Sequence, residues 1–249
     1  MAQFSVILLA AGSSSRFKDK EKKQYSDLDG RAVWLYSLDL FSIRQDIAQI
    51  LIVINPEDED LVNRRYRANI AFIPNAKIVK GGKERVDSVQ NALAHVLPSV
   101  DFVAIHDAAR PCVTRDMVQE VFDAAIRTGA AALAYPIADT IKRVDDQHRS
   151  IDTVSRDGLW CTQTPQVFSR KILIEAYTHR AKAKTPITDD AQLVESLGEP
   201  VSLVTSDATN IKITTRKDIL LASAILKSRP KPKSEGFIHP FAEDRMWES

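Results

Sequence analysis

Cysteine is scarce in this chain, since its 249 residues include only Cys112 and Cys161. Two cysteines provide neither a disulfide framework nor the paired spacing of a zinc site, and they fit a reducing, cytoplasmic compartment. Residues 1–15 lack the charged start and cleavage pattern of a signal peptide. No apolar run approaches the ~18 residues of a membrane span. We therefore expect a soluble cytoplasmic protein that does not bind a membrane.

An excess of charge of either sign is also missing, because the formal net charge is only +1 at pH 7. A nucleic-acid-binding protein usually has a basic bias over a whole face. The composition thus argues against a nucleic-acid partner, and any electropositive site must be local. The length is enough for one large α/β domain with a substantial core, with or without appendages.

Apolar strand-like runs alternate with helical patterns along the chain. This alternation predicts an α/β, Rossmann-like fold with a mostly parallel open sheet and helices on both faces. Apolar residues at helical spacing begin at Val86 and, behind a possible N-cap at Thr114, at Met117. The strands are expected at Val6–Ala10, Ile50–Ile54, Lys77–Val79, Phe102–His106, Ala131–Pro136 and Val201–Val204.

Two segments break this alternation. Residues 139–160 are polar and contain two short alternating stretches, which predicts a protruding β-hairpin arm. Because such an arm cannot bury itself, we expect it to pack on a partner subunit in a homodimer. After about Lys227 the composition is rich in Pro, Lys and Ser, as in a linker. The predicted organisation is a domain at 1–227 and a poorly ordered tail at 228–249.

Three loops are the predicted walls of a site, because ligands of open α/β sheets bind beyond the carboxyl ends of the strands. These loops are Gly12–Lys23, Gly81–Ser88 and His106–Pro111. The first passes from two alanines and a glycine into serines and cations, which suits a phosphate-bearing ligand because small residues let backbone N–H groups approach an anion. It is neither a Walker loop nor a dinucleotide fingerprint, since Ser14 stands where the latter needs its second glycine.

The other two loops offer different groups. Glycines 81 and 82 leave the backbone unshielded beside the Ser88 hydroxyl, which suits recognition of a base edge. Asp107 could hold a metal or a ribose hydroxyl, and Arg110 a phosphate. The plainer interpretation of the two glycines is a turn, and that of Asp107 with Arg110 is a structural ion pair. His106 is better explained as a packed, hydrogen-bonded histidine than as a base, because no nucleophile or paired carboxylate accompanies it.

Two later segments also have plain structural interpretations. Thr164–Gln166 contains a proline and is a candidate turn. Thr188 is a candidate N-cap for a helix whose first turn carries Asp189 and Asp190, where acidic side chains favour the helix dipole. Neither segment indicates a site by itself.

In their order along the chain, several motifs together are much more specific than any one loop. Over about residues 4–226 the chain resembles the 2-C-methyl-D-erythritol 4-phosphate cytidylyltransferases of the non-mevalonate isoprenoid pathway. The motifs that carry the resemblance are LAAGSSSRF with KKQY, GGKERVDSV, VAIHDAARP, DTIKR, RDGLWCTQTPQVF, ITDDAQLVE and NIKIT. The resemblance implies transfer of the cytidylyl group of CTP to the polyol phosphate, with release of pyrophosphate and with Mg²⁺ bridging the triphosphate oxygens.

The resemblance also implies roles for individual residues. Arg16 and Lys23 would stabilise the transition state at the α-phosphate of CTP, and Arg156 and Lys212 would position the polyol phosphate. Asp107 would lie in the nucleotide and metal region and is the one candidate metal ligand. On the arm, Thr140 and Arg156 would serve the neighbouring subunit's site. The implied substrate contacts are Ala10, Ala11, Gly12, Gly81, Gly82, Ser88, Asp107, Ala108, Arg110, Thr140, Thr164 and Thr188.

The chain departs from the family's usual pattern at four positions. Ser14 and Phe17 stand where a second glycine and a methionine are common, Lys22 replaces a proline, and Thr209 replaces an aspartate. Three other functions stay open. One is transfer to a different polyol phosphate such as ribitol 5-phosphate, and a second is an α/β glycosyltransferase, against which the loop from Arg16 to Lys23 argues. The third is a nucleotide-binding module without turnover.

Overall fold

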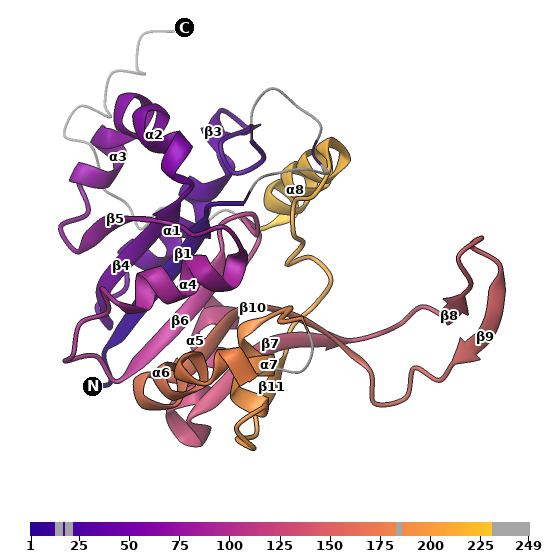
Figure 1. The fold of residues 1–249 in the computed structure, drawn as a ribbon. Coiled ribbons are helices and arrows are strands. Elements are labelled where there is room, and N and C mark those ends of the chain that lie inside the picture. The colour runs from indigo at the N-terminus through magenta and orange to yellow at the C-terminus, as the bar shows by residue number, and fades with distance from the viewer. Residues whose placement is uncertain (13–16, 18–21, 183–185, 231–249) are drawn as a thin grey trace, which may run out of the picture.

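A single seven-stranded sheet runs through the computed structural model, which describes residues 1–12, 17, 22–182 and 186–230 (Figure 1). The order of its strands is β11-β7-β10-β6-β1-β4-β5. The strands are β1 (Phe4–Ala10), β4 (Ile47–Ile54), β5 (Ala76–Lys80), β6 (Phe102–Asp107), β7 (Ala130–Pro136), β10 (Trp160–Ser169) and β11 (Ser202–Thr205). All six predicted strands are therefore confirmed, with small shifts at their ends.

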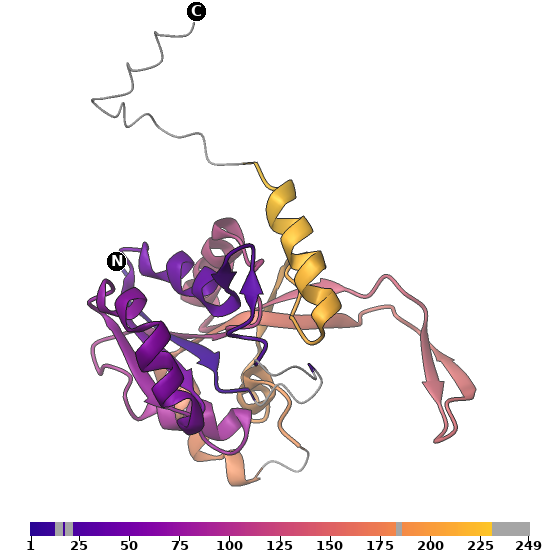
Figure 2. The ribbon, with the colours of Figure 1, turned by 90° about the horizontal axis from the view of Figure 1, so that it is seen from above.

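Helices cover both faces of this sheet, as the alternating pattern predicts (Figure 2). Because side chains alternate along β1, Val6 and Leu8 face a core shared with α1 and α5, while Ile7 faces α4, α6 and α7 on the other side. The fold is thus α/β and Rossmann-like. The helices are α1 (Val33–Ser42), α2 (Glu59–Arg65), α3 (Arg67–Ala71), α4 (Arg85–Leu93), α5 (Arg115–Thr128), α6 (Arg170–Thr178), α7 (Asp190–Glu195) and α8 (Arg216–Ser228), with 3₁₀ turns η1 (Pro56–Asp58) and η2 (Arg180–Lys182).

One strand of the seven-stranded sheet, β10, is missing from the sequence prediction. It lies between β6 and β7 and is antiparallel to both. The candidate turn at Thr164–Gln166 is therefore wrong, because these residues belong to β10. Proline cannot donate a ladder hydrogen bond, and the pairing with β7 is interrupted between Thr162 and Gln166, around Pro165. A polar segment with a central proline does not show the apolar run that identifies the other strands.

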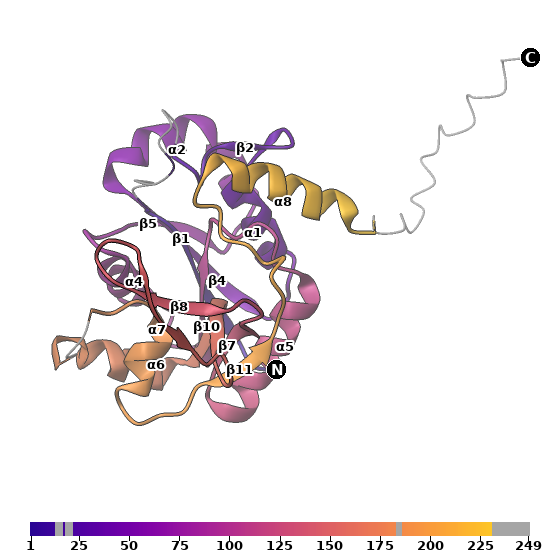
Figure 3. The ribbon, with the colours of Figure 1, turned by 90° about the vertical axis from the view of Figure 1, so that its right-hand side faces the viewer.

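A small apolar cluster fixes the C-terminal helix α8 beside the short hairpin of β2 (Asp27–Leu28) and β3 (Arg31–Ala32) (Figure 3). Leu28, Val33 and Ala222 are buried in it together with Cys112. Burial raises the pKa of the Cys112 thiol to about 11, so this thiol is structural and not reactive. The predicted tail at 228–249 lies outside the described residues from residue 231 on.

The polar stretch at 139–160 forms the predicted arm. Strands β8 (Ile141–Val144) and β9 (Ser150–Val154) pair antiparallel and project away from the sheet (Figures 1 and 2). The arm exposes apolar side chains, since Ile151 is 64% and Trp160 38% accessible. The hairpin is confirmed, and its own chain leaves these side chains partly uncovered.

Two helix starts test the predicted caps. The Thr114 side chain accepts a hydrogen bond from the backbone N–H of Met117, which confirms the cap of α5. At α7 the N-cap is Asp189, which accepts from the N–H of Gln192, and Thr188 lies one residue too early. Both residue types can cap a helix, so sequence alone does not separate neighbouring candidates. Of the helices in the described ranges, none is both long and apolar enough to cross a membrane.

Candidate active site

A cleft of about 290 Å³ opens beyond the carboxyl ends of β1, β4 and β6. The three predicted loops all contribute to its wall, together with the segment between β11 and α8. The lining residues are Leu9, Ala10, Ala11, Gly12, Lys23, Gln24, Asn55, Gly82, Lys83, Glu84, Arg85, Ser88, Asp107, Ala109 and Lys212. Lys83, Glu84 and Arg85 lie in the predicted Gly81–Ser88 loop but have no predicted role of their own, and Leu9, Gln24 and Asn55 lie outside the three predicted loops.

The floor of the first loop is held by a buried glutamine. The side-chain amide of Gln24 donates to the carbonyl oxygens of Ala10 at 2.7 Å and Gly12 at 3.2 Å. These bonds join the two ends of the phosphate-binding segment and place the neighbouring Lys23 at the cleft wall. Arg16, the other cation predicted to act on the α-phosphate, lies outside the described residues, as does Ser14.

The Gly81-Gly82 pair is a point of close packing. The N–H of Gly82 donates to the Ser88 hydroxyl at 3.0 Å, and that hydroxyl donates to the Glu84 carbonyl at 3.0 Å. A Cβ on Gly82 would lie 2.3 Å from Cβ of Asp87, and one on Gly81 would lie 2.7 Å from Cβ of Ala11. Close approach of the loop to α4 and β1 therefore explains the two glycines better than a plain turn does.

Replacing Gly82 by alanine should destabilise the loop, because the new methyl group overlaps Asp87. We expect a loss of about 1–3 kcal/mol in the free energy of unfolding, measured by urea denaturation. Gly12→Ala is the matched control: a Cβ there meets no atom within 4 Å, and its stability should stay within about 0.5 kcal/mol of wild type. Equal stabilities of the two variants would contradict the packing explanation.

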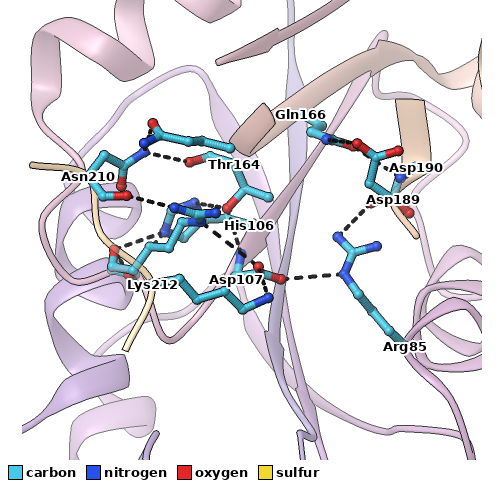
Figure 4. A network of polar contacts seen from close by, with 12 residues as sticks. Arg85, His106, Asp107, Thr164, Gln166, Asp189, Asp190, Asn210 and Lys212 are labelled. Carbon is cyan, nitrogen blue, oxygen red and sulfur yellow. Dashed lines mark hydrogen bonds and ion pairs between the residues drawn. The ribbon is translucent and has the colours of Figure 1, made fainter. Parts of the chain in front are cut away.

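Asp107 is the electrostatic centre of the cleft (Figure 4). Its Oδ2 lies 2.6 Å from Nζ of Lys212 and 4.0 Å from Nε of Arg110, and its Oδ1 lies 3.4 Å from Nε of Arg85. Burial alone would raise the pKa of Asp107, but the three cations outweigh burial and lower it well below its usual range. The carboxylate is therefore ionised at neutral pH.

Arg110 and Thr164 support this centre from behind the cleft wall. The Arg110 guanidinium donates to the carbonyl of Asn210 at 2.7 Å. The Thr164 hydroxyl accepts from the backbone N–H of Asp107 at 3.0 Å and lies 3.1 Å from Nδ1 of His106. Neither residue is among those that line the cleft. Ala108 is fully buried, and Gly81 also lies just behind the lining.

His106 has the structural role expected from its position in an apolar strand. It is fully buried, with Ser37 Oγ 3.2 Å from its Nε2. Burial lowers its pKa to about 4, so the imidazole is neutral. Among the described residues that line the cleft there is neither a histidine nor a cysteine. The described wall thus offers cations, one buried carboxylate and backbone groups, and not a nucleophile–base pair.

Three residues predicted to contact substrate are not among those that line the cleft of their own chain. Thr140 and Arg156 are exposed on the arm, where Arg156 donates to the carbonyl of Ala138. Thr188 is exposed, and its N–H and hydroxyl donate to the side-chain oxygen of Gln192. Their predicted contacts need either a second subunit or a bound substrate.

A preformed metal cage is not part of this arrangement. In the described ranges no group of three or more His, Cys, Asp and Glu side chains is placed to hold a metal ion. Asp107 is ionised and lies in the cleft, so it suits a cation that takes one protein carboxylate and completes its shell with substrate phosphates and water. Mg²⁺ commonly binds in this way.

The comparisons with known proteins agree over nearly the whole chain. The family model of 2-C-methyl-D-erythritol 4-phosphate cytidylyltransferase matches residues 4–228. The chain is similar to the enzymes of that name from Desulforamulus reducens, at 38% identity over 229 residues covering 92% of this chain and 98% of the relative, and from Syntrophus aciditrophicus, at 41% identity over 233 residues covering 93% and 97%.

Solved structures give the same result. The 4-diphosphocytidyl-2C-methyl-D-erythritol synthase of Anaerococcus prevotii aligns with a TM-score of 0.75 and 31% identity, over 91% of this chain and 99% of that one. The 2-C-methyl-D-erythritol 4-phosphate cytidylyltransferase of Thermus thermophilus aligns with a TM-score of 0.73 and 32% identity, over 89% and 98%.

Proposed function

The chain belongs to the 2-C-methyl-D-erythritol 4-phosphate cytidylyltransferase family, and we propose that its cleft is where it transfers the cytidylyl group of CTP to 2-C-methyl-D-erythritol 4-phosphate. The products are 4-diphosphocytidyl-2-C-methyl-D-erythritol and pyrophosphate, in the non-mevalonate route to isoprenoid precursors. One observation carries the proposal. The cleft brings the small residues at the end of β1, the loop that contains Gly82, Asp107, Lys23 and Lys212 together at the carboxyl ends of the strands.

The reaction is an in-line displacement at the α-phosphorus of CTP. An oxygen of the polyol phosphate attacks, a new P–O bond forms, and the bond to the β-phosphate breaks with its electrons leaving on pyrophosphate. Such a reaction needs positioning and charge neutralisation and does not require a protein nucleophile. The composition of the cleft, with lysines and without a histidine or cysteine in its described wall, suits this chemistry.

The cleft suggests a division between the two substrates. Small residues at 10–12 and Lys23 would hold the triphosphate, and the Gly82 loop would face the cytosine. Lys212, on the opposite side of Asp107 from Arg85, would hold the polyol phosphate. Lys23 would then offset charge on the pentacoordinate phosphorus and the leaving group, with Arg16 as its predicted companion from outside the described residues.

Asp107 would be the protein ligand of Mg²⁺, with the remaining ligands supplied by the triphosphate and water. The ion supplies neutralisation of the charge on the phosphate oxygens. Because Lys212 lies 2.6 Å from Oδ2 of Asp107, its ammonium would compete with the ion for this carboxylate. Movement of Lys212 toward the polyol phosphate would free that oxygen.

The arm supports a homodimer in which each subunit completes the site of the other. It projects from its own chain and leaves Ile151 and Trp160 exposed, and burying such side chains against a second copy is favourable. Thr140 and Arg156 would then enter the partner's cleft, and Arg156 would position the polyol phosphate there.

Pyrophosphate release tests the proposal. The purified protein should release pyrophosphate only when CTP, the polyol phosphate and Mg²⁺ are all present, and addition of EDTA should stop the release until Mg²⁺ is supplied in excess. Either substrate alone is the control. Release from CTP without an acceptor would indicate hydrolysis, and an absence of release with both substrates would contradict the proposed function.

A further inference from the structure

Arg85 lines the cleft, yet neither the motif nor the mechanism above gives it a task. We propose that Arg85 is a positioning residue: it acts on the reaction through Asp107, and the buried carboxylate of Asp190 holds it in place. The proposal rests on the function proposed above, because it assigns a residue to the same cleft.

The contacts of Arg85 join the cleft to the interior (Figure 4). Arg85 is the first residue of α4, and its guanidinium lies between two carboxylates from other elements. Nη2 donates to Oδ2 of Asp190 at 2.7 Å, and Nε lies 3.4 Å from Oδ1 of Asp107. One end of the guanidinium is therefore bound to a fixed carboxylate, while the other end faces the carboxylate in the cleft.

Asp190 is a rigid support. It is fully buried at the start of α7, and the Tyr177 hydroxyl donates to its Oδ1 at 2.6 Å. The backbone N–H groups of Asp190 and Ala191 both donate to the side-chain oxygen of Gln166, at 3.1 and 3.0 Å. Leaving a buried charge without its partner is strongly unfavourable. Asp190 therefore keeps Arg85 in place when the contents of the cleft change.

Lys212 behaves differently because it is an ammonium on a flexible stem. It reaches Asp107 from the segment between β11 and α8, and its proposed task is to bind the polyol phosphate. When Lys212 turns to that phosphate, Asp107 loses its closest cation. Arg85 cannot move with Lys212, because its departure would leave the buried carboxylate of Asp190 without a cation. Arg85 therefore keeps Asp107 oriented throughout the reaction.

A double-mutant cycle measures this dependence. Arg85→Gln should lower kcat/KM at least about tenfold, and Asp107→Asn should lower it further. If Arg85 acts through Asp107, the double variant should fall no more than about threefold below Asp107→Asn alone. If the two losses multiply, Arg85 contacts the substrates independently and the proposal is overturned. Arg85→Gln within threefold of wild type would overturn it as well.

Two further variants separate positioning from folding. Arg85→Gln leaves Asp190 buried without its cation, so the cycle is repeated with Asp190→Asn in every protein, which removes the buried negative charge that would otherwise be left unpaired. The matched control is Arg180→Gln. Arg180 pairs at 2.7 Å with Asp87, which lies on α4 as Arg85 does, but Arg180 does not line the cleft. It should keep kcat/KM within about threefold of wild type. A loss in Arg180→Gln as large as in Arg85→Gln would indicate a general effect on α4.

The affinity for CTP, measured by calorimetry in the same proteins, keeps this test distinct from that of the proposed function. If wild type binds CTP but releases no pyrophosphate, the proposed function fails. The double-mutant cycle of Arg85 and Asp107 is then evaluated on the Kd for CTP in place of kcat/KM, because Asp107 lies in the nucleotide region of the cleft. Non-additive losses support the positioning role, and multiplied losses contradict it.

Discussion

Lys23→Ala should lower kcat by at least about 10²-fold while the protein remains folded, which is the scale of losing one preorganised donor to a developing charge. Lys23 directly precedes Gln24, whose side-chain amide donates to the carbonyl oxygens of Ala10 and Gly12. The backbone at Lys23 is therefore held beside residues 10–12 before substrates bind. The loss should appear in kcat more than in KM, because the interaction strengthens as charge develops on the leaving pyrophosphate.

The neighbouring lysine provides a matched control. Lys22 carries the same charge one residue earlier, but its ammonium is paired with Asp58 at 2.7 Å and does not line the cleft. Lys22→Ala should keep kcat within about threefold of wild type. Single-turnover measurement of both variants separates chemistry from product release. A kcat for Lys23→Ala within threefold of wild type would exclude its role at the α-phosphate.

The second large effect is recovery of activity in mixed dimers. Lys23→Ala and Arg156→Ala should each be nearly inactive alone. In a heterodimer of the two, one site combines the intact Lys23 of its own subunit with the intact Arg156 from the other arm. The second site lacks both groups, so a purified heterodimer should regain about half of the wild-type activity.

Differently tagged subunits allow the heterodimer to be isolated before it is assayed. Arg149→Ala is the control on the same arm, because Arg149 pairs with Asp145 within the hairpin at 2.8 Å and should be active by itself. Without recovery in the isolated Lys23→Ala and Arg156→Ala heterodimer, the arm does not complete the partner's site.

Much of the fold could be predicted because it depends on local pattern. Strand β1 and its neighbours are apolar on both faces, since helices cover both sides of the sheet. The arm is recognisable because its polar alternation cannot build a core. Strand β10 could not be predicted, because it pairs a polar, proline-containing segment with two apolar strands distant in the sequence.

The site, like the fold, has parts that the sequence predicts and parts that it does not. The loops of the cleft could be predicted, because the carboxyl ends of parallel strands meet at one edge of a sheet. The partners of Asp107 could not be predicted from pattern. Arg85 and its anchor Asp190 are separated by 105 residues in the sequence, and no spacing rule connects them. Thr164, implied by the resemblance to touch substrate, also holds the backbone of Asp107 from within β10, at a distance of 57 residues in the sequence.

The acceptor specificity tests the account most directly. With CTP saturating, kcat/KM is measured for 2-C-methyl-D-erythritol 4-phosphate and for ribitol 5-phosphate, and ³¹P NMR identifies the new diphosphate linkage in the product. We expect 4-diphosphocytidyl-2-C-methyl-D-erythritol to form and its acceptor to be preferred by at least about 10²-fold, the scale on which a pocket discriminates between substrates that differ by one small group. Equal or greater kcat/KM with ribitol 5-phosphate would contradict the account.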